Sequence, residues 1–159
     1  MVKVLVLYYS RAGDVEAMAK AVAEGVNSVE GASSRIARVD YANIDDFISC
    51  DAVAFGSPNY FGYMAGLMKD FFDRAWTARE KVSGKLAVAF TCGGSSSNAA
   101  LLSLERMYSS FKLEKASEGV VWGIRDQGAP SEKELTACKK IGEALAKAAV
   151  EKEAKEPTD

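Results

Sequence analysis

Apolar runs and amphipathic stretches alternate along the whole chain. Residues 2–9 are almost entirely apolar, which is typical of a strand that is covered on both faces of a sheet. From Val15 onward, apolar side chains recur three and four residues apart, which indicates the buried face of a helix. Later apolar runs predict further strands at 35–39, 51–57, 86–91 and 119–124. Later stripes at helical spacing predict helices at 44–48, 64–76, 100–111 and 131–150.

Strand and helix alternate in this way five times, without an internal repeat or a linker. Right-handed crossovers would then place the strands in one parallel sheet with helices on both faces. We therefore predict a single doubly wound α/β domain over residues 1–150, with a five-stranded parallel sheet. Gly142, inside the last predicted helix, indicates a close contact between that helix and the sheet. Residues 151–159 are mostly charged and include a proline, so we expect them to fray.

Length and charge narrow the classes of protein that fit. A chain of 159 residues suits one well-cored domain, and a net charge of −2 gives no electrostatic case for binding nucleic acid or an anionic membrane. No apolar run approaches the roughly 20 residues that cross a bilayer. The first residues form a strand pattern rather than a secretory signal, so we expect a cytoplasmic protein.

The residues available for catalysis are few. The sequence contains no histidine, which removes Ser-His-Asp and Cys-His mechanisms and most catalytic zinc sites. Cys50, Cys92 and Cys138 are far apart and odd in number, so they predict reduced thiols rather than disulfides or a metal site. We assign no catalytic or metal-binding residue, and expect the chemistry to belong to a bound cofactor.

The turn at residues 10–15 is a candidate anion site. In a doubly wound sheet, ligands bind beyond the carboxyl ends of the strands, where a helix also begins with free backbone N–H groups. Ser10 adds a hydroxyl, Arg11 a positive charge, and Gly13 allows close approach of the backbone. Neither a Walker loop nor the dinucleotide pattern G-x-G-x-x-G is present, so a single phosphate monoester fits best. The alternative is that Ser10 and Asp14 only cap a helix.

The turn at residues 57–63 carries Tyr60, Phe61 and Tyr63 around a glycine, directly after a predicted strand. Aromatic rings on a ligand-side turn are suited to stacking on a flat ring system. The alternative is that Phe61 packs into the core. A phosphate turn beside an aromatic turn predicts a phosphorylated flat heterocycle as the ligand, and the small and hydroxyl-bearing residues 91–98 would form the third wall of its site.

The segments YYSRAGDVEAMAKAVAEG, FGSPNYFGYMAGLMKDFFD, LAVAFTCGG and GAPSEKELTACKKIGEALA resemble the flavodoxin-like superfamily, and most of all the WrbA family of NAD(P)H:quinone oxidoreductases. The resemblance implies a three-layer flavodoxin-like fold that holds FMN without a covalent bond. It implies that one turn wraps the phosphate, namely Ser10, Arg11, Ala12, Gly13, Asp14 and Val15. It implies that a second turn contacts the isoalloxazine and the ribityl chain, namely Ser57, Pro58, Asn59, Tyr60, Phe61, Gly62 and Tyr63. It implies that a third lines the other edge of the ring, namely Thr91, Cys92, Gly93 and Gly94.

The chain also departs from the family pattern. Asp14 stands where phosphate turns of the family usually carry Thr, Asn, His or Tyr, and an acid beside a phosphate dianion is repulsive unless Arg11 offsets it. The segments 41–50 and 126–131 are short where the WrbA family has insertions that contribute to tetramers, and the histidine often found near its flavin is missing. These departures favour a monomeric carrier, while a homo-oligomer is left open.

Three functions therefore remain. The first is an electron carrier that exchanges electrons with a redox partner protein through bound FMN. The second is a WrbA-type enzyme that takes hydride from NAD(P)H and reduces quinones, which the absence of an aromatic residue from 91–98 favours because one ring face would stay open. The third is a flavin-free interaction module, which Asp14 favours.

Overall fold

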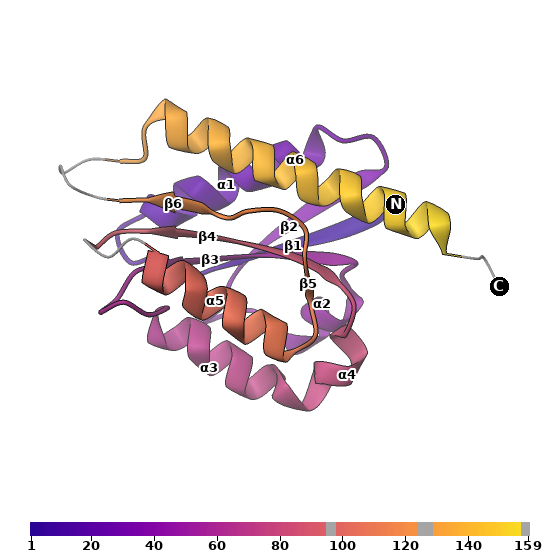
Figure 1. The fold of residues 1–159 in the computed structure, drawn as a ribbon, viewed down its shortest axis with the longest axis horizontal. Coiled ribbons are helices and arrows are strands. Elements are labelled where there is room, and N and C mark those ends of the chain that lie inside the picture. Colours follow the sequence, from indigo (N-terminus) through magenta and orange to yellow (C-terminus); the bar gives the residue numbers. More distant parts are fainter. Residues whose placement is uncertain (95–97, 124–128, 157–159) are drawn as a thin grey trace.

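The computed structural model describes residues 1–94, 98–123 and 129–156, in which a parallel sheet lies between two layers of helices (Figure 1). The strands are β1 (Val2–Tyr8), β2 (Ala32–Arg38), β3 (Ala52–Pro58), β4 (Leu86–Cys92), β5 (Glu114–Lys115) and β6 (Val120–Trp122). The helices are α1 (Asp14–Asn27), α2 (Ile44–Ser49), α3 (Gly66–Ala75), a 3-10 turn η1 (Trp76–Ala78), α4 (Arg79–Val82), α5 (Asn98–Ser110) and α6 (Glu132–Lys155). The α/β architecture predicted from the hydrophobic pattern is confirmed.

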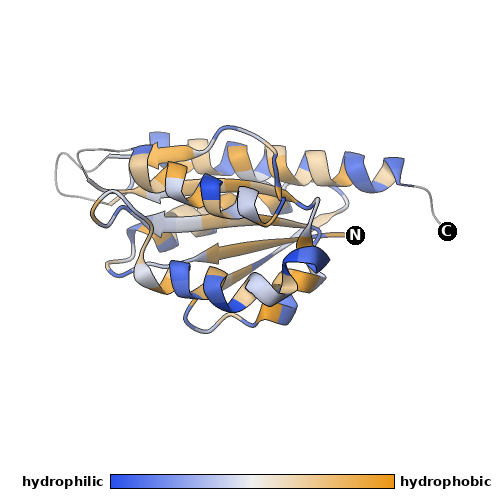
Figure 2. Cartoon of the chain, turned by 60° about the horizontal axis from the view of Figure 1, so that its bottom comes forward, coloured by the Kyte–Doolittle hydropathy of each residue, from blue (hydrophilic) through white to orange (hydrophobic). Residues whose placement is uncertain are grey.

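Both faces of the sheet are buried, as the continuous apolar runs predict. Side chains of β1 alternate between two cores, with Val4 and Val6 in the core under α1 and α6, and Leu5 and Leu7 in the core under α3 and α5. All four are at most 1% exposed. The central strands β1, β3 and β4 are accordingly mostly hydrophobic, whereas the helices carry hydrophilic residues on part of their surface (Figure 2).

The order of the strands determines where a ligand site can form. The order is β2-β1-β3-β4-β5, with β6 also beside β4, and every pair is parallel. The chain leaves β1 for β2 on one side and later crosses to β3 on the other side, so the strand order reverses at β1. Crossovers that leave toward opposite faces open a crevice at such a point, beyond the carboxyl ends of the strands.

The fifth strand of the predicted sheet is divided into two short strands. The prediction of one strand at 119–124 is confirmed only for β6, and Ile124 lies outside the described residues. β5 was not predicted, because Glu114 and Lys115 are charged and exposed. Between the two strands, Ala116–Gly119 lies opposite the shorter segment Val88–Ala89 of β4, so the longer segment has to bulge.

The last helix is longer than its sequence predicts. We expected fraying from residue 151, but α6 continues to Lys155, and 157–159 lie outside the described residues. Glu, Lys and Ala are strong helix formers. Lys152 also fixes this end, because its Nζ donates to the Gly84 carbonyl at 2.5 Å and pairs with Glu114 at 3.0 Å. Along the described ranges, no helix is both long and apolar enough to cross a membrane.

Helices α1 and α6 touch through two glycines. A Cβ atom on Gly25 would lie 1.9 Å from the Lys139 carbonyl oxygen, and one on Gly142 would lie 2.0 Å from the Val22 carbonyl oxygen. Such separations are far below van der Waals contact, so only glycine fits at either position. The close contact predicted from Gly142 therefore exists, but the prediction was wrong about the partner, which is helix α1 rather than the sheet.

We expect Gly142→Ala to lower the free energy of unfolding by about 1–3 kcal/mol or more, because the added methyl group forces α1 and α6 apart. The measurement is urea denaturation followed by circular dichroism. Gly66→Ala is the matched control, since a Cβ there meets nothing within 4 Å and Gly66 lies at the start of α3. It should leave stability unchanged or slightly higher. Equal stabilities of the two variants would contradict the helix contact.

Candidate functional site

Three turns meet at the carboxyl edge of the sheet, following β1, β3 and β4. The strand register aligns the ends of these three strands, because Tyr8 lies opposite Gly56 and Pro58 lies opposite Cys92. The second and third turns are joined directly, because the Asn59 backbone N–H donates to the Cys92 carbonyl at 2.7 Å. The first turn begins beside the second, because the Tyr9 N–H donates to the Gly56 carbonyl at 3.0 Å and the rings of Tyr9 and Tyr60 meet at a centroid distance of 6.4 Å. The prediction that these three turns form one region is therefore confirmed.

The first turn presents the N-terminus of α1. Gly13 is the N-cap, with a φ of 96° that side-chain-bearing residues rarely adopt, and as a glycine it has no side chain with which to cap the helix. The Ser10 hydroxyl accepts a hydrogen bond from the Gly13 N–H at 3.0 Å, so it shapes the turn rather than capping α1. The alternative of a plain helix cap by Ser10 or Asp14 is therefore wrong. The first N–H groups of α1 are available to an anion, as is the positive end of the helix dipole.

The second turn is a two-residue hairpin. The backbones of Tyr60 and Tyr63 exchange both hydrogen bonds, at 2.9 and 3.1 Å, and the Asn59 side-chain oxygen accepts from the Gly62 N–H at 2.8 Å. Tyr60 is half-buried, and its ring meets that of Tyr9 edge to face at a centroid distance of 6.4 Å. Burial is also the main cause that raises the pKa of the Tyr60 phenol above its usual value. Tyr60 is thus a fixed aromatic wall that faces the first turn.

Phe61 occupies the apex of this hairpin in an unfavourable conformation. Its φ is 55° and that of Gly62 is 76°, the positive pair that a type I′ turn requires. A bulky residue with positive φ is a backbone outlier, and the Phe61 side chain is fully exposed, at 108% relative accessibility. The alternative that Phe61 packs into the core is therefore wrong. The positive φ of Phe61 lowers stability, and among the described residues its exposed ring gains no burial that would offset this cost.

The third turn follows β4 and is formed by two glycines. Gly93 and Gly94 have φ values of 96° and 80°, and a Cβ on Gly94 would lie 2.9 Å from the Asn59 side-chain nitrogen. Cys92 is 3% exposed, and burial raises the pKa of its thiol to about 12, with a further contribution from Asp14. The thiol therefore stays protonated at neutral pH and is a packing group rather than a reactive one. Residues 95–97 of the predicted wall lie outside the described residues.

Several predicted contact residues are oriented away from the crevice. The side chains of Val15, Ser57 and Thr91 are at most 1% exposed, so only their backbone groups can reach a ligand. Ser57 is engaged in the fold, because its hydroxyl accepts from the Ala65 N–H at 2.8 Å and donates to the Pro58 carbonyl. Tyr63 lies on the other side of the hairpin, where it lines a hollow of about 430 Å³ against α5.

Two residues that support the turns were not predicted. Arg38, the last residue of β2, donates to the Ser10 carbonyl at 2.8 Å. Ser103, on the buried face of α5, accepts from the Met64 N–H at 3.0 Å and so fixes the hairpin from behind. A cation at the end of an edge strand and a hydroxyl within an apolar helical stripe were the only signals in the sequence. Neither indicates by itself which carbonyl or N–H it would bind.

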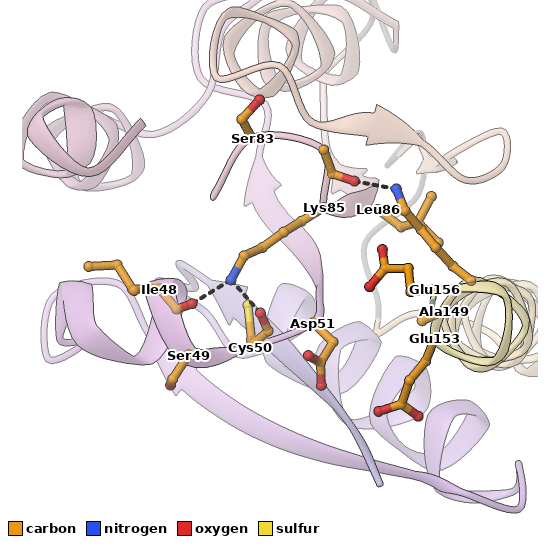
Figure 3. Close-up of a pocket in the computed structure, with 12 residues that line it drawn as sticks. Ile48, Ser49, Cys50, Asp51, Ser83, Lys85, Leu86, Ala149, Glu153 and Glu156 are labelled. Atoms are coloured by element: carbon orange, nitrogen blue, oxygen red, sulfur yellow. Dashed lines mark hydrogen bonds between the residues drawn. The ribbon is translucent and has the colours of Figure 1, made fainter. Parts of the chain in front are cut away.

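A separate hollow of about 410 Å³ lies at the opposite edge, by the amino ends of β3 and β4 (Figure 3). Lys85 occupies it, and its ammonium donates to the carbonyls of Phe47, Ile48 and Cys50. All three of its donors are therefore used to hold the end of α2. This hollow serves the packing of the fold and is remote from the three turns.

Comparison with known proteins identifies the family. Residues 41–122 match the family model described as NADPH-dependent FMN reductase. A flavodoxin of Aquifex aeolicus (strain VF5) is 34% identical to this chain over 168 residues, which cover 92% of the chain and 86% of that flavodoxin. This chain belongs to the flavodoxin family. The family relationship speaks against the flavin-free module, since flavodoxins bind FMN.

Solved flavodoxin-like structures share the fold. A flavodoxin from the domain Archaea superposes with a TM-score of 0.82 at 23% identity, over 94% of this chain and 99% of that one. The WrbA-like flavodoxin of Agrobacterium tumefaciens superposes with a TM-score of 0.77 at 21% identity, over 95% and 99% of the two chains. At these identities the likeness is one of fold, so it gives the WrbA family no preference over other flavodoxins.

The site of this flavodoxin family member fits FMN in its main features. The uncapped start of α1 with Gly13 suits a phosphate, and the half-buried Tyr60 offers an aromatic face nearby. The turn of Gly93 and Gly94 presents backbone without side chains, so it can approach a ligand closely. The acidic residues Asp14 and Glu16 are unfavourable for a phosphate, because they place negative charges in the first turn of α1.

We expect Phe61→Asn to raise the free energy of unfolding of the FMN-free protein by about 1 kcal/mol, because asparagine tolerates positive φ and Asn-Gly is the preferred type I′ pair. Urea denaturation measures the change. The matched control is Tyr41→Asn, which also removes an exposed aromatic ring (84% exposed) but at a residue without positive φ. The control should change stability by less than about 0.5 kcal/mol. A destabilised Phe61→Asn protein would contradict backbone strain at this position.

Proposed function

We propose that this chain is an electron carrier that holds FMN at the carboxyl edge of its sheet and exchanges electrons with a redox partner protein. FMN binding and flavodoxin-like redox function are those of the family to which it belongs. The observation that carries the proposal is the convergence of the N-terminus of α1 with the aromatic hairpin at one edge of the sheet, where the rings of Tyr9 and Tyr60 meet at a centroid distance of 6.4 Å. A phosphate site and a ring site on adjacent turns suit a flavin mononucleotide.

Different residues of the site would hold the phosphate and the ring of FMN. The backbone N–H groups of Ala12, Asp14 and Val15 and the charge of Arg11 would bind the phosphate. Ser10 keeps the turn in shape by accepting the Gly13 N–H. Tyr60 and the backbone of Asn59–Gly62 would orient the ring and exclude water from one of its sides. Gly93 and Gly94 would border its other edge. FMN supplies the redox chemistry when it is bound, while the protein sets orientation, access and potential.

The second candidate is an NAD(P)H:quinone oxidoreductase of the WrbA type. Two observations favour it: residues 41–122 match a family described as NADPH-dependent FMN reductases, and Thr91–Gly94 contributes no aromatic side chain. One face of the ring would then be free for a planar substrate. The quinone, NAD(P)H and a homo-oligomer all belong to this second proposal. A cytoplasmic location suits either candidate, because the three cysteines are free thiols.

The two candidates differ in their response to NADPH. We expect the FMN-loaded protein to keep its flavin absorbance when it is mixed with excess NADPH without oxygen, because a carrier receives electrons from a protein. Stopped-flow absorbance measures this, with dithionite as the positive control for reduction. Rapid bleaching by NADPH, followed by recovery on addition of a soluble quinone, would establish the enzyme instead. Absence of saturable FMN binding would remove both.

We expect Asp14→Asn to tighten FMN binding about two- to fivefold, since it removes a negative charge from the first turn of α1. Riboflavin, which lacks the phosphate, should bind with unchanged affinity. Quenching of flavin fluorescence measures both dissociation constants, and the gain should shrink in high salt. Asp45→Asn, in the first turn of α2, is the control and should change neither value. An equal gain for riboflavin would show that Asp14 does not act on the phosphate.

A further inference from the structure

We propose that Arg38 is a positioning residue of the phosphate turn: it holds the Ser10 carbonyl so that the Arg11 N–H is directed into the crevice. The inference rests on the proposed binding of FMN, and it adds a residue from β2 to a site otherwise built from the turns after β1, β3 and β4. Arg38 acts on the site through Ser10, because its guanidinium donates to the Ser10 carbonyl and to the Asp40 carboxylate.

All three guanidinium nitrogens of Arg38 have partners. Nη1 donates to the Ser10 carbonyl at 2.8 Å, while Nε and Nη2 donate to the two carboxylate oxygens of Asp40 at 3.1 and 3.2 Å. The guanidinium carbon also lies 5.6 Å from the ring centroid of Tyr9 and 5.9 Å from that of Tyr8. The guanidinium group is thus fixed by hydrogen bonds on two sides and by contacts with two aromatic rings. These contacts define its orientation, which a single surface ion pair would not do.

The contact between Arg38 and the Ser10 carbonyl also fixes the direction of the Arg11 N–H, because both groups belong to one peptide. The carbonyl of Ser10 and the N–H of Arg11 belong to the same planar trans peptide, so they point in opposite directions. Arg38 lies on β2, and β2 pairs with β1 on the side away from β3. A Ser10 carbonyl that points toward β2 therefore directs the Arg11 N–H toward β3, where the strand order reverses and the crevice opens.

The same residue is linked to the helix end. The Ser10 side chain accepts from the Gly13 N–H at 3.0 Å, and Gly13 is the N-cap of α1. Holding the Ser10 peptide therefore also holds the hydroxyl that positions Gly13. The series Asp40, Arg38, Ser10 and Gly13 connects the edge strand to the N–H groups that would bind the phosphate.

The contact is not needed to pair the strands. β1 and β2 are in register from Val2 opposite Ala32 to Tyr8 opposite Arg38, and the backbone continues with the Val39 N–H donating to the Tyr8 carbonyl at 2.9 Å. Arg35, on the same strand, forms an exposed ion pair with Asp46 and lies opposite Leu5, three residues before Arg38. It is a matched control for removing a charge from β2.

The experiment compares FMN with riboflavin in fluorescence-quenching titrations of Arg38→Gln. FMN affinity should fall about tenfold or more, because a donor to a charged group is misdirected, while riboflavin affinity stays within twofold. Arg35→Gln should leave both affinities unchanged. Arg38→Lys retains the charge but cannot bond Ser10 and both Asp40 oxygens at once, so it should not restore FMN binding. Equal losses for the two flavins, or full rescue by lysine, would overturn the proposal.

Hydrogen exchange of the Gly13 amide, measured by NMR in the FMN-free proteins, gives a readout that needs no cofactor. Exchange should be about tenfold faster in Arg38→Gln than in the wild type and unchanged in Arg35→Gln. An unchanged rate in Arg38→Gln would refute the positioning role, whatever the titrations show. A wild-type protein that binds no FMN would instead refute the proposed function, and the Gly13 exchange would still decide the role of Arg38.

Discussion

The parallel pairing of β1 with both β2 and β3 is the constraint on which the rest of the structure depends. It reverses the strand order at β1 and sends the connections on its two sides to opposite faces of the sheet. The start of α1, with Gly13 as its N-cap, thereby lies at the same edge of the sheet as the hairpin after β3. Buried side chains on both faces of β1 hold this arrangement, since a shift of one residue would exchange the two cores.

Hydrogen bonds from side chains to the backbone then give the turns their shape. Ser57 and Ser103 receive the N–H groups of Ala65 and Met64 where the hairpin leads into α3, and Arg38 holds the Ser10 carbonyl. Each of these side chains lies behind the turn it supports rather than in the crevice. The groups that face a ligand are therefore mostly backbone, and they depend on residues that a ligand would never touch.

The fold was readable from the sequence because its signals are local. Continuous apolar runs marked β1, β3 and β4, and stripes at helical spacing marked α1 and α5, since both patterns arise from residues a few positions apart. The divided fifth strand was missed because its bulge depends on how Ala116–Gly119 lies against β4. The three turns of the site were found from their composition, whereas Arg38 and Ser103 were not, because their partners lie 28 and 39 residues away in the chain. The exposed orientation of Phe61 depends on a type I′ turn, which favours asparagine at this position. A phenylalanine there does not indicate such a turn.

The contact of α1 and α6 through Gly25 and Gly142 ties the phosphate turn to a distant part of the molecule. Gly25 follows Asp14 by 11 residues, which corresponds to about 16 Å along the helix axis. A side chain added at either glycine would push α1 away from α6, and the first turn of α1 would move with the rest of the helix. The position of the N–H groups that would bind the phosphate is therefore set partly by a helix–helix contact far from the crevice.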